Sequence, residues 1–212
     1  MAFLDTLLDI LFPDKCLGCG LSRTPLCSAC LSKLPRAWDN QSDMRACFEF
    51  GDPLMRLAIH KLKYKRWQRL ASILGVSLGE LILEDLSDQA LFGNVANVII
   101  VPAPLSRERL RERGFNQAEL LAEVASQITG IPIENEVIEK IKHTPAQVSL
   151  KKRASRLASP KGAFAITDKS EIIGKSVIVI DDVYTTGATA SEIMRVLKLA
   201  GARETTTYTL AH

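Results

Sequence analysis

Two adjacent carboxylates, Asp181 and Asp182, come directly after four branched aliphatic residues at positions 177–180. A short apolar run of this kind is typical of a strand buried on both faces of a parallel sheet. Ligands of such sheets bind outside the carboxyl ends of the strands, so the sequence places both side chains at a binding edge. Ionised carboxylates only accept hydrogen bonds, and a pair of them suits two neighbouring hydroxyl groups such as those of a ribose.

Five small and hydroxyl residues follow shortly after: Thr185, Thr186, Gly187, Ala188 and Thr189. A helical pattern comes next, and the unpaired N–H groups and dipole of a helix N-terminus favour an anion. The glycine lets the backbone approach a phosphate closely, and the lack of a GK[ST] pattern excludes a Walker loop. A turn with capping Asp and Thr is the purely structural alternative. Together with the carboxylates, the loop predicts a pocket for a ribose 5-phosphate group.

Four of the five cysteines, Cys16, Cys19, Cys27 and Cys30, form two CxxC pairs separated by seven residues. Each pair presents two thiolates from one tight turn, and a tetrahedral zinc ion requires four. Disulfides are the alternative, but nothing else in the sequence marks a secreted chain. Four thiolates leave no open position for chemistry. We therefore expect a structural zinc ion that stabilises a segment too small for its own core.

Basic residues gather in two segments, although the whole chain carries a formal charge of only +3. Residues 60–69 hold five cations and residues 140–161 hold seven, and neither segment contains an acidic residue. Each segment either binds an anion or is simply a solvated basic surface. The first also contains aromatic rings, which can stack on the bases of a single strand; packing of its tryptophan in the core is the alternative. The candidates for contact with DNA are Lys61, Lys63, Lys65, Arg66 and Trp67.

Strand and helix patterns alternate along the chain and predict the elements that position these groups. Strands are expected at 48–50, 98–101, 137–141, 175–180 and 205–210, and helices from 53 onward and over 68–85, 117–129 and 190–199. This alternation predicts an α/β fold with a mostly parallel sheet flanked by helices and right-handed crossovers. We expect two parts: an N-terminal helix and four-cysteine module over residues 1–47, and an α/β domain over 48–212.

The N-terminal stretch, MAFLDTLLDILF, is apolar but short. Asp5 and Asp9 interrupt it and no basic segment precedes it, so it does not read as a secretory signal. Its leucines recur at helical spacing, which predicts a short amphipathic helix. No apolar run reaches the roughly 18 residues of a membrane span. We expect a cytoplasmic protein without an integral membrane segment.

The run VIVIDDVYTTGAT, residues 177–189, closely resembles the phosphoribosyl pyrophosphate (PRPP) motif of type I phosphoribosyltransferases. Three further blocks resemble the ComF family, the competence-associated branch that includes GntX-like proteins: VPAPL at 101–105, RGFNQ at 113–117 and TPAQ at 144–147. Members of that family also carry an N-terminal four-cysteine zinc module and an HKLKY stretch like the one at 60–64. The resemblance extends over nearly the whole chain and implies a type I phosphoribosyltransferase fold.

The resemblance also implies roles for matching residues. Asp181 and Asp182 would hold the ribose hydroxyls, Thr185 to Thr189 the 5-phosphate, and magnesium would bridge pyrophosphate and ribose oxygens. The turn Pro102, Ala103 and Pro104 corresponds to the pyrophosphate loop. Residues 142–161 correspond to a flexible loop, in which Ala158 and Ser159 stand where the family pattern has an asparagine. Candidates for anion contact there and nearby are Arg113, Gln147, Arg153 and Arg156.

Two functions from different classes follow. The ComF resemblance implies a competence protein that binds PRPP and supports the handling of incoming single-stranded DNA in natural transformation, with other competence proteins as possible partners. The alternative is an active PRPP-dependent phosphoribosyltransferase with an unidentified acceptor. Single-strand binding should weaken steeply with salt because counterions are released, which discriminates the first function.

Overall fold

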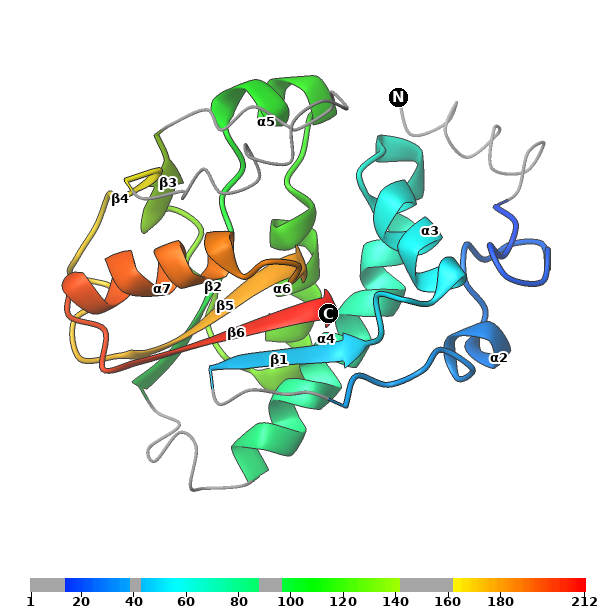
Figure 1. Ribbon diagram of the computed structural model, residues 1–212, viewed down its shortest axis with the longest axis horizontal. Helices are drawn as coiled ribbons and strands as arrows, with labels where there is room; N and C mark the ends of the chain where they lie inside the picture. The colour runs from blue at the N-terminus through cyan, green and yellow to red at the C-terminus, as the bar shows by residue number, and fades with distance from the viewer. Residues whose placement is uncertain (1–13, 39–42, 88–96, 142–161) are drawn as a thin grey trace.

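Four parallel strands form the central sheet of the computed structural model, which describes residues 14–38, 43–87, 97–141 and 162–212 (Figure 1). The strand order is β1 (Met44–Phe48), β6 (Glu204–Ala211), β5 (Ser176–Val183) and β2 (Val98–Pro102). The two central strands, β6 and β5, are almost wholly buried, as expected of strands covered on both faces. The parallel sheet that the sequence predicts is confirmed.

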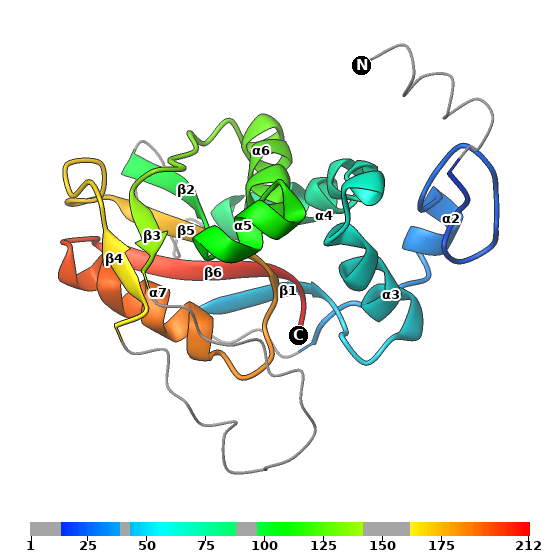
Figure 2. The ribbon, with the colours of Figure 1, turned by 90° about the horizontal axis from the view of Figure 1, so that it is seen from above.

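Helices cover both faces of the sheet (Figures 1 and 2). Helices α4 (Arg69–Ser87) and α6 (Gln117–Thr129) pack together on one face, and α7 (Ala188–Leu199) lies on the other. Alternate residues of the strands feed two separate cores: Ile178 and Ile180 face α4 and α6, whereas Val177 and Val179 face α7. Odd-numbered and even-numbered residues of the run at 177–180 therefore pack against the helices on opposite faces of the sheet.

Two glycines allow α4 and α6 to approach closely. A Cβ atom at Gly75 would lie 2.7 Å from the Cβ of Val124, and one at Gly79 would lie 2.7 Å from the Cβ of Ile128. Because real Cβ atoms do not approach so closely, both positions require glycine for packing. Glycine is otherwise unfavourable inside a helix, and the close approach of α6 explains its presence at these two positions of α4.

Several predicted elements differ in position. The strand expected at 48–50 is wrong: β1 occupies Met44–Phe48 and pairs with β6, so the main sheet includes residues assigned to the N-terminal module. The strand expected at 137–141 is β3 (Ile138–Lys140), which pairs antiparallel with β4 (Phe164–Ile166) in a separate two-stranded sheet. A helix that was not predicted, α5 (Arg107–Arg113), begins at a Ser106 cap and ends at Gly114.

Helix α3 (Pro53–Leu62) lies between the cysteine-containing segment and the sheet (Figures 1 and 2). It begins at Asp52, whose carboxylate accepts a hydrogen bond from the Met55 N–H at 2.9 Å. The short helix α2 (Ser28–Leu31) belongs to the cysteine segment, and the 3-10 turn η1 (Lys65–Trp67) connects α3 to α4. Leu26 and Leu34 are buried in the same core as α3 and α4, so the module shares its apolar contacts with the α/β domain.

Within the described ranges, no helix combines the length and apolarity needed to cross a membrane. The predicted N-terminal helix and the flexible-loop segment, with Gln147, Arg153 and Arg156, lie outside the described residues.

Candidate functional site

The carboxylate pair lies at the carboxyl end of β5. Asp182 is buried and Asp181 half-buried, opposite Thr209 of β6. The backbone N–H of Asp182 donates to Oδ1 of Asp181 at 2.8 Å. Burial, together with the negative charge of Asp182, raises the pKa of Asp181 to about 8. The two carboxylates therefore lie at the predicted edge of the sheet, and the pKa of Asp181 is well above that of an ordinary carboxyl group.

Side chains from two distant segments converge on Asp182. Gln117, the first residue of α6, donates from Nε2 to Oδ2 of Asp182 at 3.3 Å. Arg113 in turn donates to Oε1 of Gln117 at 2.7 Å. From the other side, Nζ of Lys63 lies 3.8 Å from the same Asp182 oxygen. Asp182 is thus held by an amide and a cation, and a guanidinium lies one residue further out.

The loop after the diacid turns at Gly187, whose φ of +69° lies in the left-handed region that favours glycine. Gly187 caps the N-terminus of α7, so the helix dipole points into the loop. Thr185, Thr186 and Thr189 are exposed. Together with Asp181 and Thr209 the loop lines one hollow. Exposed hydroxyls and unpaired N–H groups around a helix N-terminus are suited to a phosphate.

A second loop is bonded to the same strand. The N–H of Ala103 donates to the carbonyl of Ile180 at 2.8 Å, directly before the diacid. Asn116 fixes the loop from the other side, because its Nδ2 donates to the carbonyl of Ala103 at 3.1 Å. The predicted turn at Pro102, Ala103 and Pro104 therefore lies next to the carboxylates. The RGFNQ block serves both the loop, through Asn116, and the diacid, through Arg113 and Gln117.

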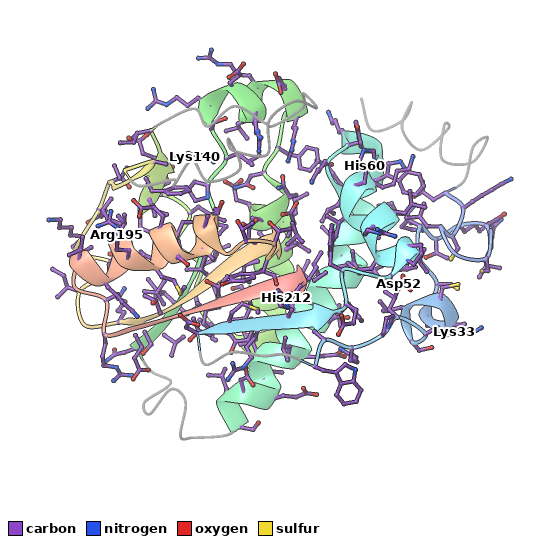
Figure 3. All side chains as sticks on the ribbon, in the orientation of Figure 1. Lys33, Asp52, His60, Lys140, Arg195 and His212 are labelled. Atoms are coloured by element: carbon purple, nitrogen blue, oxygen red, sulfur yellow. The ribbon has the colours of Figure 1, made fainter. Side chains whose placement is uncertain are left out.

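Lys140 brings a further cation towards the diacid. It closes β3, directly before the segment of residues 142–161, and Figure 3 shows it beside α5. Its Nζ lies 5.4 Å from the centre of the Phe164 ring. Burial lowers the pKa of Lys140; nearby Arg109 lowers it further, whereas Asp181 raises it. Sequence reasoning did not single out this residue.

The four cysteines gather as predicted. Their sulfur atoms all lie within 4.8 Å of one another, with Cys16–Cys27 at 3.6 Å and Cys19–Cys27 at 3.7 Å. A tetrahedron with Zn–S bonds of about 2.3 Å has sulfur atoms about 3.8 Å apart, so the geometry fits a four-thiolate metal site. Gly18 permits this packing, since a Cβ there would lie 2.7 Å from Cys30 Sγ and 3.1 Å from Leu54 of α3.

The basic segment at 60–69 divides between the surface and the interior. Lys65 is exposed, whereas Trp67 is half-buried against the main core with Nζ of Lys61 5.4 Å from the centre of its ring. Lys63 points to Asp182 and not into open solvent. The side chain of Arg66 lies outside the described part. Trp67 therefore has the core contacts that its packing alternative expects, and Lys63 lies at the diacid site.

Comparison with known proteins identifies the family. The chain is 33% identical over 190 residues to "DNA utilization protein YhgH" of Escherichia coli O157:H7, covering 88% of this chain and 79% of that protein. It is 37% identical over 113 residues to "Competence protein F" of Haemophilus influenzae and 39% identical over 113 residues to "Competence protein ComFC" of Bacillus subtilis. The chain belongs to the ComF family. It spans 49% and 43% of those two competence proteins, respectively.

A family model described as "Phosphoribosyl transferase domain" matches residues 117–212. That range of this ComF-family chain begins at Gln117 and contains both carboxylates and the whole phosphate loop. With the parallel sheet flanked by helices, the match confirms the type I phosphoribosyltransferase fold.

Proposed function

We propose that this ComF-family protein binds PRPP together with magnesium and uses that site in the handling of incoming single-stranded DNA during natural transformation. The observation that carries the proposal is the convergence of three groups on the end of β5. These are the diacid, the loop that Gly187 turns, and the Pro102–Pro104 loop hydrogen-bonded to Ile180.

Each part of PRPP has a counterpart in this arrangement. The carboxylates of Asp181 and Asp182 accept hydrogen bonds from the two ribose hydroxyls. The N–H groups and hydroxyls of residues 185–189 bind the 5-phosphate at the helix N-terminus. The pyrophosphate lies against the Pro102–Pro104 loop, with Arg113 and Lys140 as nearby cations. Magnesium enters with PRPP and neutralises its pyrophosphate.

The metal at the four cysteines is zinc in this proposal, and its role is structural. The sulfur spacing fits a tetrahedral ion, and four thiolates close the coordination shell. In this fold Leu54 of α3 lies beside the cysteine turn, and Lys63, directly after the last residue of α3, lies beside Asp182. The zinc ion therefore supports an element of the PRPP site as well as its own segment.

The DNA-handling part rests on the relatives, which are named for DNA utilization and competence, and on the basic surface near the site. Exposed Lys65 and half-buried Lys61 supply positive charge that attracts a phosphate backbone. Catalytic transfer from PRPP to an unidentified acceptor is the second candidate. The cations Arg113 and Lys140 support it, since both lie near the diacid and a departing pyrophosphate requires charge stabilisation.

Binding of a fluorescent oligothymidylate, measured over a range of salt concentrations with and without PRPP and magnesium, tests the proposal. We expect a steep loss of affinity with salt and a change in affinity when PRPP binds. Release of pyrophosphate from PRPP, in the presence of DNA or of nucleobases, would move the assignment to the transferase. Salt-independent affinity, or no affinity for the single strand in any condition, would contradict the DNA-handling function.

A further inference from the structure

We propose that Tyr64 forms a stacking site for a nucleobase at the mouth of the diacid site. The ligand class is a planar base carried either by a free nucleobase or nucleoside or by single-stranded DNA. The location of the reactive ribose next to this site rests on the proposed function. The stacking surface itself rests on the geometry of α3 and η1.

Tyr64 is placed by its neighbour in the chain. Lys63 turns inward and reaches Asp182, and the next residue, Tyr64, turns outward with 53% of its surface exposed. Its N–H donates to the carbonyl of Lys61 at 2.9 Å, and its carbonyl accepts from the N–H of Trp67 at 2.9 Å. The backbone is therefore fixed on both sides of the exposed ring, one residue from the group that contacts the diacid.

The surroundings of the ring are aromatic on one side and cationic on the other. His60, one helical turn earlier, packs against it with ring centroids 5.3 Å apart and planes tilted by 58°. Figure 3 shows His60 near the end of α3 that rises to the same side of the molecule as α5. Burial lowers the pKa of Arg113, whereas the charge of Asp182 and, more weakly, Tyr64 raise it, so the guanidinium belongs to the same neighbourhood as both. Arg113 in turn bonds Gln117, which bonds Asp182.

An exposed aromatic face with cations beside it is the arrangement that binds bases irrespective of sequence, since every base presents a π-face. Stacking on the Tyr64 ring requires only a planar ligand, so we expect the site to accept different bases. The ribose ring of a ligand held by Asp181 and Asp182 would lie near the exposed face of Tyr64. A strand lying along the basic segment would bring its bases to the same ring.

The test compares three variants of the metal-loaded full chain. Tyr64→Leu removes the aromatic face, and Tyr64→Phe keeps it. Trp38→Leu removes an aromatic residue that is 88% exposed and flanks the edge strand β1, two strands away from β5. The probes are fluorescein-labelled oligothymidylate at two salt concentrations, and adenine with and without PRPP and magnesium.

We expect Tyr64→Leu to weaken one of the two probes about 5- to 150-fold, with Tyr64→Phe and Trp38→Leu close to wild type. The salt dependence should be unchanged, because stacking releases no counterions. An effect on adenine only when PRPP is present identifies an acceptor base; an effect on the oligonucleotide without PRPP identifies a strand. The second result stands even if PRPP fails to bind, so it separates this inference from the proposed function. Equal affinities of wild type and Tyr64→Leu for both probes, or no binding of either probe by wild type, would overturn it.

Discussion

Replacing Gly187 with alanine tests whether the phosphate loop has one permitted shape. An alanine at φ +69° carries a strain of about 1–2 kcal/mol. Its Cβ would also lie 2.2 Å from the hydroxyl oxygen of Tyr184, so the tyrosine ring, now 5.4 Å from that of His212, must move. Because Tyr184 is half-buried and is contacted at the outer end of its side chain, moving the ring off its rotamer costs about 0.5–1.5 kcal/mol more. Because Tyr184 lines the same hollow as the loop, we expect PRPP affinity to fall at least about tenfold.

Gly130→Ala is the matched control. Gly130 ends α6 with a φ of +72°, and no heavy atom lies within 4 Å of an added Cβ. Urea unfolding should show a loss of about 1–2 kcal/mol for the control and a clearly larger loss for Gly187→Ala. Adding Tyr184→Leu to Gly187→Ala should restore the steric part of the loss. Equal losses in the two glycine variants, with PRPP binding unchanged, would refute the reasoning.

Three further perturbations have clear expected outcomes. Asp181→Asn should have a higher melting temperature than wild type, and the difference should widen between about pH 4 and pH 8 and then stay constant. The reason is that the raised pKa of Asp181 favours folding only while its carboxyl group is protonated. Melting temperatures of the two proteins that differ by the same amount at every pH would contradict this reasoning. Gly79→Ala should lower the free energy of unfolding by about 1–3 kcal/mol through its clash with Ile128, and urea unfolding at or above wild-type stability would count against that packing. Metal chelation, or Cys19→Ser, should speed amide exchange in residues 14–34 and in α3 while α7 stays protected; unchanged exchange in α3 would show that the module is independent.

The sequence predicted the elements whose signals are local. The short apolar runs at 98–101 and 177–180 are typical of buried strands and form β2 and β5. The helix expected over 117–129 is α6, which begins at an Asn116 cap and ends at a left-handed Gly130. The strand expected at 48–50, the residues FEF, was misplaced because aromatic residues are common in strands. Glu49 and Phe50 instead bond Pro35 and His212 through their backbones, outside the ladder. Helix α5 was not predicted because six of its seven residues are charged, so it has no apolar face that repeats at helical spacing.

The site was predicted as far as its motifs are contiguous. The strand end, the diacid and its loop occupy thirteen consecutive positions, 177–189, and the four thiolates two short turns. The groups that hold Asp182 are different: Gln117 lies 65 residues away in the chain, and Lys63 is further still. No local spacing connects such residues, because the topology of the sheet brings them together. The lysine that we first assigned to DNA contact is therefore recognisable as part of the diacid site only in the folded structure.

Calorimetric titration of the zinc-loaded protein with PRPP and magnesium tests the central claim most directly. The comparison is between wild type, the double variant Asp181→Asn/Asp182→Asn, and Glu204→Gln, which alters an exposed carboxylate at the opposite end of β6. We predict binding by wild type and Glu204→Gln that the double variant loses while remaining folded. Absence of heat in the folded wild type, or equal binding by the double variant, would contradict the assignment of this edge of the sheet as a PRPP site.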